Sequence, residues 1–205
     1  MISLAYITFN EEKYIERSIL SAKKLADEII VVDSFSTDKT VEICGMLGAK
    51  VFQEKWKHDF SYAKNLMISK CTQQWILSLD ADEHIEGERL ELINIALKTG
   101  PENEIVAWEF IRKNHYPIHE SDSPYFGPPF YPDMQIRLFQ RRPEIYYSGD
   151  VHEGLLQSIQ AANIGYVGRI PVCIHHHMFR GDKERFEIPK NKYYSDITKG
   201  VFHGS

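Results

Sequence analysis

Trp75 to His84 reads WILSLDADEH, an apolar run that ends in three acidic residues within four positions. The apolar part is typical of a buried strand, and burying carboxylates beside it is costly unless a positive group compensates. Asp80 and Asp82, two residues apart, can turn toward one point where the strand breaks and present oxygen ligands to Mg²⁺ or Mn²⁺. The alternative is an acidic turn before a helix, in which Glu83 is a helix-start residue.

The segments around this strand predict an α/β fold. Apolar runs predict strands, and amphipathic runs between them predict helices that begin after Asn10, Thr40 and Asp59 and after residue 86. The expected strands are residues 2–7, 28–33, 49–53 and 75–80. This alternation indicates a mostly parallel sheet with helices on both faces, which binds ligands at the carboxyl ends of its strands.

The second half of the chain is expected to be rich in strands. Four runs without helices between them have this pattern, at residues 104–112, 134–140, 145–155 and 168–177. A long Pro- and Tyr-rich loop, residues 114–133, separates the first two, and a terminal helix is expected at about 182–199. Long loops in compact domains are commonly functional.

Composition excludes several classes of protein. The 205 residues are 43% hydrophobic with a net charge of -5, which is ordinary for a globular protein and gives no general reason to bind nucleic acid. Three widely spaced cysteines without a C-x-x-C pair favour the cytoplasm over a disulfide scaffold. The amino terminus has no pattern of a signal peptide or membrane span. The final residues, GVFHGS, are typical of neither a helix cap nor a closing strand, and the sequence does not explain them.

Four segments in order carry a resemblance to a known family: LAYITFNEE, IIVVDSFSTDKT, DFSYAKN and WILSLDADE. They resemble family 2 glycosyltransferases, which have the GT-A fold, use sugar nucleotides and invert the anomeric centre. Later segments, RLFQRR, GDVHEGL and IHHHMF, are similar to the subgroup of lipopolysaccharide core glucosyltransferases and peptide S-glycosyltransferases. The chain departs from the family at Ser34, where a second Asp is common. The resemblance implies a nucleotide-sugar-binding half, residues 1–103, and an acceptor-side half, residues 104–205.

The resemblance also implies roles for individual residues on the donor side. Asp33 would bind the base or ribose, Lys64 the diphosphate, Asp80 the ribose or a metal-bound water, and Asp82 the metal. The residues expected to line the nucleotide pocket are Thr8, Asn10 and Glu12. Ordinary structural roles are the alternatives: a solvated helix lysine for Lys64, and helix caps for Ser36 and Thr37.

The resemblance to this subgroup implies that Glu153 is the catalytic base, with Asp150 as second choice. An exposed strand carboxylate is the alternative for Glu153. The run from His175 to His177 ends an apolar strand, so alternate members point to opposite faces. The resemblance implies a histidine near the metal, for which His176 is the best match, with His175 and His177 as alternatives. Structural histidines are the other interpretation. The run of histidines could instead suggest a zinc hydrolase. Such an enzyme needs a ligand set with a nearby carboxylate and an open position, and the acids after residue 79 explain more of the sequence.

The expected function is inverting transfer from a sugar nucleotide, with a UDP-sugar favoured and Mn²⁺ or Mg²⁺ as cofactor. The acceptor is expected to be a carbohydrate, a lipid-linked molecule or a peptide. The protein is expected in the cytoplasm, free or associated peripherally with the inner face of the membrane. The alternatives are a non-catalytic sugar-nucleotide-binding module, a truncated inactive enzyme, or a nucleotidyltransferase. The last is disfavoured because ITFNEEK lacks a Gly-rich basic loop.

Overall fold

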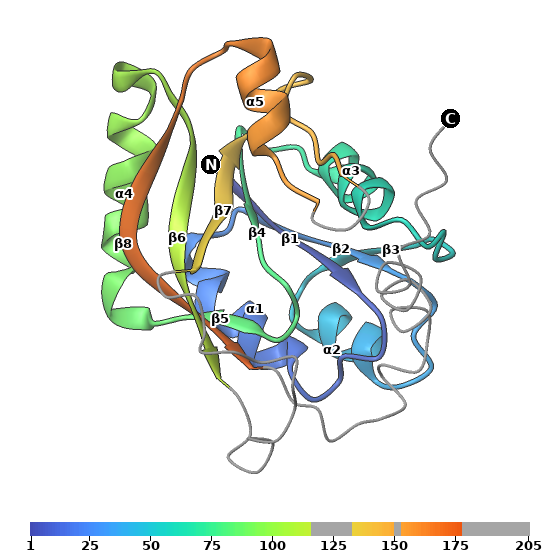
Figure 1. Ribbon diagram of the computed structural model, residues 1–205. Helices are drawn as coiled ribbons and strands as arrows, with labels where there is room; N and C mark the ends of the chain where they lie inside the picture. Colours follow the sequence, from blue (N-terminus) through green and yellow to red (C-terminus); the bar gives the residue numbers. More distant parts are fainter. Residues whose placement is uncertain (116–132, 150–152, 178–205) are drawn as a thin grey trace, which may run out of the picture.

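The computed structural model describes residues 1–115, 133–149 and 153–177. The strands of this part form one mixed sheet in the order β3-β2-β1-β4-β7-β6-β8-β5 (Figure 1). Their bounds are β1 Ile2–Thr8, β2 Glu28–Asp33, β3 Lys50–Gln53, β4 Trp75–Ser78, β5 Glu83–Ile85, β6 Ile105–His115, β7 Asp133–Gln140 and β8 Tyr166–His177.

The first four strands are parallel, as the alternating pattern predicts. β1 pairs with β2 and β4, and β2 pairs with β3, all in parallel. Thr8 is in register with Asp33, and Leu79 donates its backbone N–H to the Ala5 carbonyl. The carboxyl ends of β1, β2 and β4 therefore meet at one edge of the sheet.

Of the remaining strands, β7 and β5 run in the opposite direction, which makes the sheet mixed. β7 is antiparallel to β4 and β6, β8 is parallel to β6, and β5 is antiparallel to β8. The strand β5 replaces the helix start expected at Glu83. Glu83 is instead in register with His176, and its buried side chain contacts Arg137. That burial and the ladder with β8 outweigh the preference of an acid for a helix N-terminus.

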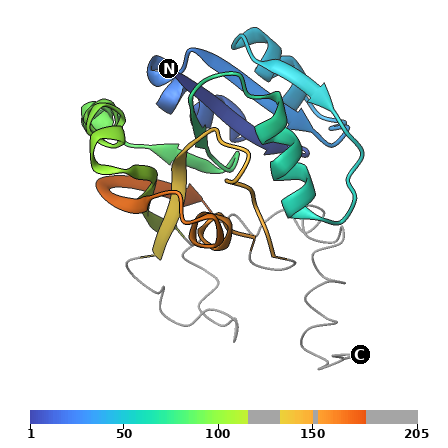
Figure 2. The ribbon, with the colours of Figure 1, turned by 90° about the horizontal axis from the view of Figure 1, so that it is seen from above.

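Helices cover both faces of the sheet, as expected (Figure 2). α1 (Ile15–Ala22), α2 (Thr40–Met46) and α4 (Leu90–Thr99) pack apolar side chains into one core cluster. α3 (Phe60–Lys70) and α5 (Leu156–Ala162) pack into the cluster on the other face. Short 3₁₀ turns are η1 Lys23–Leu25, η2 Gly87–Arg89 and η3 Pro101–Asn103.

Two expected helix caps are wrong and one is confirmed. α1 begins at Ile15 rather than after Asn10, which has a φ of 54° and uses its side chain to accept from the Thr37 N–H. Ser36 likewise does not cap α2, whose N-cap is Lys39; the Ser36 hydroxyl accepts from the Asn10 N–H and donates to Asp33. Asp59 is the N-cap of α3 and accepts from the Tyr62 N–H at 2.9 Å.

The segment after β7 differs from the expected strand at 145–155. A single isolated bridge joins Ser148 and Gly154 in the described residues there, and α5 follows at once. The helix forms because Leu155 and Ile159 fill the second core cluster. The expected terminal helix and residues 116–132 of the long loop lie outside the described residues.

Candidate functional site

Thr8 and Asp33 come together at the ends of β1 and β2. The Thr8 hydroxyl donates to Asp33 Oδ1 at 3.0 Å, and the Ser36 N–H donates to Asp33 Oδ2 at 2.9 Å. Asp33 is completely buried, and the Ser36 hydroxyl donates to it as well. The carboxylate is thus held in one orientation at the edge where parallel sheets bind ligands.

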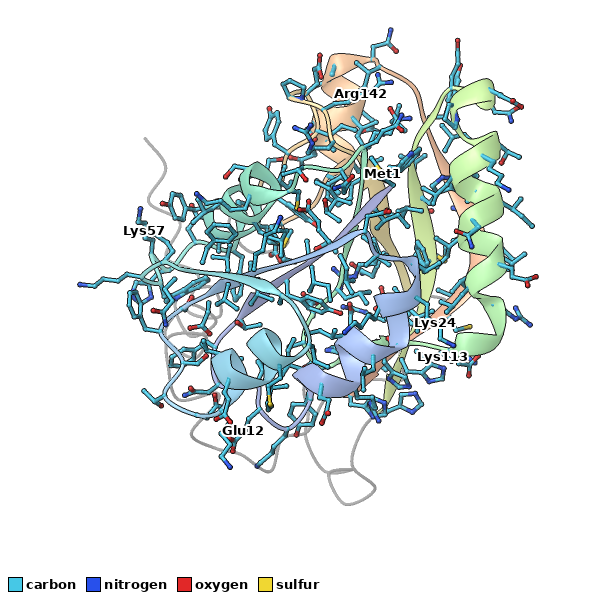
Figure 3. All side chains as sticks on the ribbon, turned by 180° about the vertical axis from the view of Figure 1, so that it is seen from behind. Met1, Glu12, Lys24, Lys57, Lys113 and Arg142 are labelled. Carbon is cyan, nitrogen blue, oxygen red and sulfur yellow. The ribbon has the colours of Figure 1, made fainter. Side chains whose placement is uncertain are left out.

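Asn10 and Glu12 tie the loop after β1 to the loop after β2. Asn10 donates its N–H to Ser36 Oγ at 2.9 Å, and its side chain accepts from the Thr37 N–H at 2.8 Å. Glu12 accepts from the Lys39 N–H at 3.0 Å. Figure 3 shows Glu12 at the end of the molecule that also carries Lys113. These contacts give Asn10 and Glu12 a structural role, and contact with a nucleotide stays a prediction for both.

Asp80 follows β4 and contacts buried cations on two sides. Arg137 of β7 is only 3% exposed and donates to Asp80 Oδ2 at 2.8 Å and to the buried Glu83. Burial opposes ionisation of Asp80, but Arg137 and then Lys64 outweigh it and hold its pKa well below the usual range. Burial raises the pKa of Glu83, although Arg137 opposes this effect. Arg137 therefore holds Asp80 as a carboxylate.

Lys64 is brought to Asp80 by α3. Its side chain is buried, with Nζ 2.8 Å from Glu153 Oε1 and 3.7 Å from Asp80 Oδ1. Burial lowers the pKa of Lys64, but Asp80, Tyr147 and Glu153 together outweigh burial and raise the pKa. Asn65 exchanges two hydrogen bonds with the Tyr147 backbone, at 2.9 and 2.8 Å, which fixes α3 against the segment before Glu153. Asp150 lies outside the described residues.

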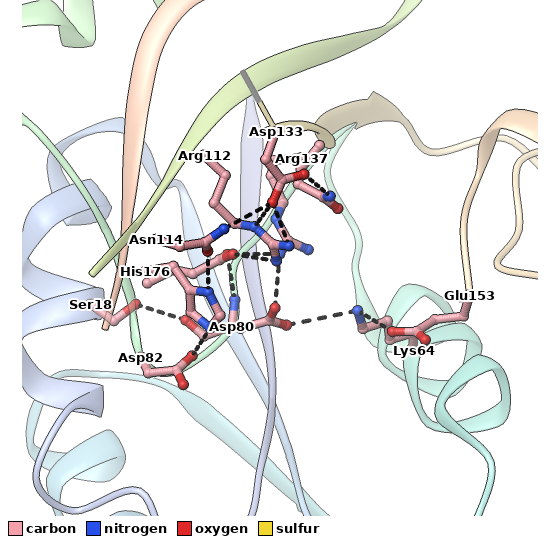
Figure 4. Close-up of polar contacts among 12 residues, drawn as sticks. Ser18, Lys64, Asp80, Asp82, Arg112, Asn114, Asp133, Arg137, Glu153 and His176 are labelled. Carbon is pink, nitrogen blue, oxygen red and sulfur yellow. Dashed lines mark hydrogen bonds and ion pairs between the residues drawn. The ribbon is translucent and has the colours of Figure 1, made fainter. Parts of the chain in front are cut away.

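Asp82 and His176 face each other beside this group (Figure 4). His176 Nε2 is 3.6 Å from Asp82 Oδ1, and the backbone of His177 donates to the Asp82 carbonyl at 3.0 Å. Alternation along β8 places His175 and His177 in a separate stack with His84 and His115, with ring centroids 4.8 to 5.0 Å apart. Of the three consecutive histidines, His176 is the one whose ring faces the Asp82 side chain.

The donor set fits a divalent cation with few protein ligands. Within residues 1–115, 133–149 and 153–177, no three His, Cys, Asp or Glu side chains converge on a point suited to one metal ion. Asp82 and His176 nevertheless offer an oxygen and a nitrogen to the same space, whereas both Asp80 oxygens contact cations. Mg²⁺ sites commonly use one or two protein ligands and complete the shell with phosphate oxygens and water. Asp82 and His176 fit that arrangement, and Asp80 lies next to them.

Sequence reasoning missed several polar residues of this site. The largest omission is Arg137, the ion partner of Asp80 and Glu83. Its signal was a charged residue inside the apolar strand run MQIRLFQ. Asn114 of β6 contacts His176 of β8, and Arg112 of β6 contacts Asp133 of β7. Only the strand pairing brings these residues together.

Comparison with known proteins assigns the family. Residues 3–153 match the model of the Glycosyl transferase family 2. The chain belongs to this family. Relatives include the SPbeta prophage-derived glycosyltransferase SunS of Bacillus subtilis, 46% identical over 83 residues, which cover 40% of this chain and 20% of SunS. An uncharacterized glycosyltransferase of Rickettsia bellii is 42% identical over 108 residues, covering 53% of this chain and 36% of that protein. The chain spans about a fifth to two fifths of these family members.

Solved structures show the same fold at low sequence identity. Staphylococcus aureus TarS 1-349 in complex with UDP-GlcNAc has a TM-score of 0.63 and 20% identity, covering 88% of this chain and 59% of that one. Glucosyl-3-phosphoglycerate synthase from Mycobacterium tuberculosis, in complex with Mg²⁺ and UDP, has a TM-score of 0.63 and 17% identity, covering 100% and 81%. The expected GT-A glycosyltransferase fold is confirmed. None of the described helices is long and apolar enough to cross a membrane.

Proposed function

We propose that this family 2 glycosyltransferase moves a sugar from a UDP-sugar to an acceptor with inversion and with help from Mg²⁺ or Mn²⁺. The observation that carries the proposal is the pairing of Asp82 with His176, 3.6 Å apart, beside Asp80 and the Lys64–Glu153 ion pair. Structural neighbours in complex with UDP and Mg²⁺, or with UDP-glucose and Mn²⁺, support the choice of donor and metal.

The donor would lie along the ends of β1, β2 and β4. Asp33, fixed by Thr8 and Ser36, would accept a hydrogen bond from the base or ribose. Lys64 would place its charge near the diphosphate, and Asp82 and His176 would hold the metal, with Asp80 in contact through water. When bound, the metal would stabilise the negative charge that develops on the leaving diphosphate.

Inversion needs one base on the opposite side of the anomeric carbon. We assign this role to Glu153, which would remove the acceptor proton as the acceptor oxygen or sulfur attacks. Asp150 is the second candidate. The ion pair with Lys64 holds the Glu153 side chain at the site. A carbohydrate, a lipid-linked molecule and a peptide remain the candidate acceptors, and a cytoplasmic location, with or without peripheral membrane contact, stays a prediction.

The test is a panel of sugar nucleotides with Mn²⁺, in which we measure nucleotide release and thermal stabilisation. We expect a UDP-sugar to give both. Asp82→Ala should abolish turnover and the Mn²⁺-dependent stabilisation by UDP, because a metal ligand is lost, while the unfolding temperature of the free protein stays the same. EDTA should have the same effect on the wild type.

Glu102→Ala is the matched control, because Glu102 is an exposed carboxylate in η3, before the start of β6. This variant should behave as the wild type. Full activity of Asp82→Ala in Mn²⁺ would contradict the proposal. Binding of UDP with Mn²⁺ but no transfer or hydrolysis of any donor would instead favour the binding-module alternative.

A further inference from the structure

A chain of hydrogen bonds lies behind His176 (Figure 4). His176 Nδ1 is 2.8 Å from Asn114 Oδ1, and Asn114 Nδ2 donates to Asp133 Oδ2 at 3.3 Å. Arg112 contacts the same Asp133 oxygen through Nε and Nη2, each at 2.7 Å. The chain begins at the Arg112–Asp133 ion pair and ends at the ring that faces Asp82.

The carboxylate sets the direction of every bond in this chain. Gln135 donates to Asp133 Oδ1 at 2.8 Å, and its hydrogen bond together with Arg112 outweighs burial and lowers the pKa of Asp133. An ionised carboxylate only accepts, so Asn114 must turn its NH₂ toward Asp133 and its carbonyl oxygen toward His176. That oxygen also only accepts. The proton of His176 therefore belongs on Nδ1.

We propose that Asn114 is a positioning residue that, with Asp133, locks His176 in the Nδ1–H tautomer and so presents Nε2 as the metal-ligating atom beside Asp82. The inference rests on the proposed function for its consequence, since Nε2 matters only if the site binds a metal. The tautomer itself is a property of the metal-free protein and is tested separately.

The contact on the far side of the ring agrees with this assignment. In the Nδ1–H tautomer, Nε2 carries a lone pair and faces Asp82 Oδ1, which also carries lone pairs. Their separation of 3.6 Å exceeds the usual hydrogen-bond range of about 2.7 to 3.2 Å. Neighbouring ligands of an octahedral Mg²⁺ lie about 3 Å apart, given metal–oxygen distances of about 2.1 Å. Two acceptors at this spacing suit a shared cation better than a direct hydrogen bond.

The first measurement is the tautomer of His176 in metal-free protein labelled with ¹⁵N-histidine, by long-range ¹H–¹⁵N NMR near pH 8, where an ordinary imidazole is neutral. Loss of the signal in His176→Gln assigns it. We expect the proton on Nδ1. In Asn114→Leu the acceptor is gone, and we expect the proton on Nε2, where Asp82 can accept it.

The second measurement is Mn²⁺ affinity in the presence of UDP, by calorimetry. Loss of a partner that orients a metal-bound histidine typically weakens binding about 10- to 100-fold, and we expect this for Asn114→Leu. The exchange variant Asn114→Asp with Asp133→Asn should retain the Nδ1–H tautomer, because the atom facing Nδ1 still accepts. The matched control is Asn103→Leu, because Asn103 is an exposed asparagine before the start of β6. It should change neither the His176 tautomer nor the Mn²⁺ affinity.

The outcomes separate this inference from the proposed function. An Nε2–H tautomer in the wild type, or an unchanged tautomer in Asn114→Leu, overturns the inference even if Mn²⁺ and UDP bind. An Nδ1–H tautomer without any Mn²⁺ binding overturns the metal-dependent function and leaves the positioning by Asn114 in place. The wild-type spectrum decides the tautomer even if a variant fails to fold.

Discussion

Lys64 contacts two carboxylates that have different proposed tasks. Its Nζ lies 2.8 Å from Glu153, the proposed base, and 3.7 Å from Asp80 on the donor side. The ion pair ties the position of the Glu153 side chain to that of Lys64. The same contact means that a change at Glu153 also alters the surroundings of Lys64.

Glu153→Gln is expected to slow transfer by about 10²- to 10⁴-fold, the usual contribution of a general base. The amide keeps the shape and can still accept from Lys64, so the donor's dissociation constant should hardly change. Both quantities are measured on one preparation, by transfer kinetics and by calorimetry with the UDP-sugar. The companion variant is Asp150→Asn.

Each result has a separate meaning for Glu153. Normal transfer by Glu153→Gln together with failure of Asp150→Asn would move the base to Asp150. A large loss of donor affinity in Glu153→Gln would instead show that the residue serves to hold Lys64. If neither variant slows transfer, the base lies elsewhere.

The aspartates of the site were predictable because each lies at or just after the end of an apolar strand. Asp33, Asp80 and Asp82 end apolar runs, and the parallel arrangement brings such ends to one edge. Arg137 and Asn114 could not be predicted as site residues, because each lies within a strand whose neighbours in the sheet are distant in sequence. The contact of Asn114 with His176 spans 62 positions and depends on the pairing of β6 with β8.

At the scale of elements, Glu28 joins three segments at the start of β2. It accepts from the Ser3 hydroxyl at 2.6 Å, from the Thr72 N–H at 2.6 Å, and from Lys50 at 3.2 Å. These residues belong to β1, the loop before β4, and β3. Burial alone would raise the pKa of Glu28, but these hydrogen bonds outweigh it and lower the pKa to about 2.

A lowered pKa in the folded state makes stability depend on pH. Glu28 contributes fully to the free energy of unfolding above its pKa in the unfolded chain, near 4.5. This contribution is lost as the pH falls toward the folded-state pKa of about 2. Its size is up to about 3 kcal/mol, at about 1.4 kcal/mol per unit of pKa. Glu28→Gln should therefore lower the free energy of unfolding at pH 6 more than at pH 3, as measured by urea denaturation.

The control for this prediction is Glu16→Gln, an exposed glutamate of α1. It should leave the difference in the free energy of unfolding between pH 6 and pH 3 as in the wild type. An equal loss of stability in Glu28→Gln at both pH values would show that the contacts of Glu28 are not tied to its charge.

Elements with a strong local pattern were predicted well, whereas β5 and α5 were missed. β2 and α3 have an uninterrupted apolar run and an N-cap, and their bounds follow from these signals. β5 has three residues and depends on pairing with β8. α5 follows a segment with a strand-like pattern, and its helical form depends on packing into the second core cluster.

At the scale of the whole molecule, one sheet crosses the expected boundary at residue 103. β4 pairs with β7, and β5 pairs with β8. Arg137 and Arg112 of the second half contact Glu83 of the first. The division into a donor half and an acceptor half stays a prediction about function, while the contacts predict a single cooperative unit of folding.

Removal of Arg137 tests this cooperativity, because Glu83 is 1% exposed and needs a compensating charge. Arg137→Met leaves that carboxylate with Arg112, whose Nη1 is 3.6 Å away. Breaking a buried ion pair from one side typically costs about 3 to 5 kcal/mol, and we expect the lower end of that range because Arg112 remains. Urea denaturation, followed by tryptophan fluorescence and by circular dichroism, measures the loss and shows whether both signals change together.

The double variant Arg137→Met with Glu83→Leu should recover much of the stability lost in the single one, because the buried charge is removed together with its partner. Asp80 would still lack its guanidinium, so catalysis should not recover with stability. This separates the two roles of Arg137: neutralising Glu83 for folding, and holding Asp80 as a carboxylate at the site. A double variant no more stable than the single one would show that the cost came from lost packing.

Two separate unfolding transitions in the wild type would show that the two halves unfold independently. That result would contradict the single cooperative unit predicted from the continuous sheet.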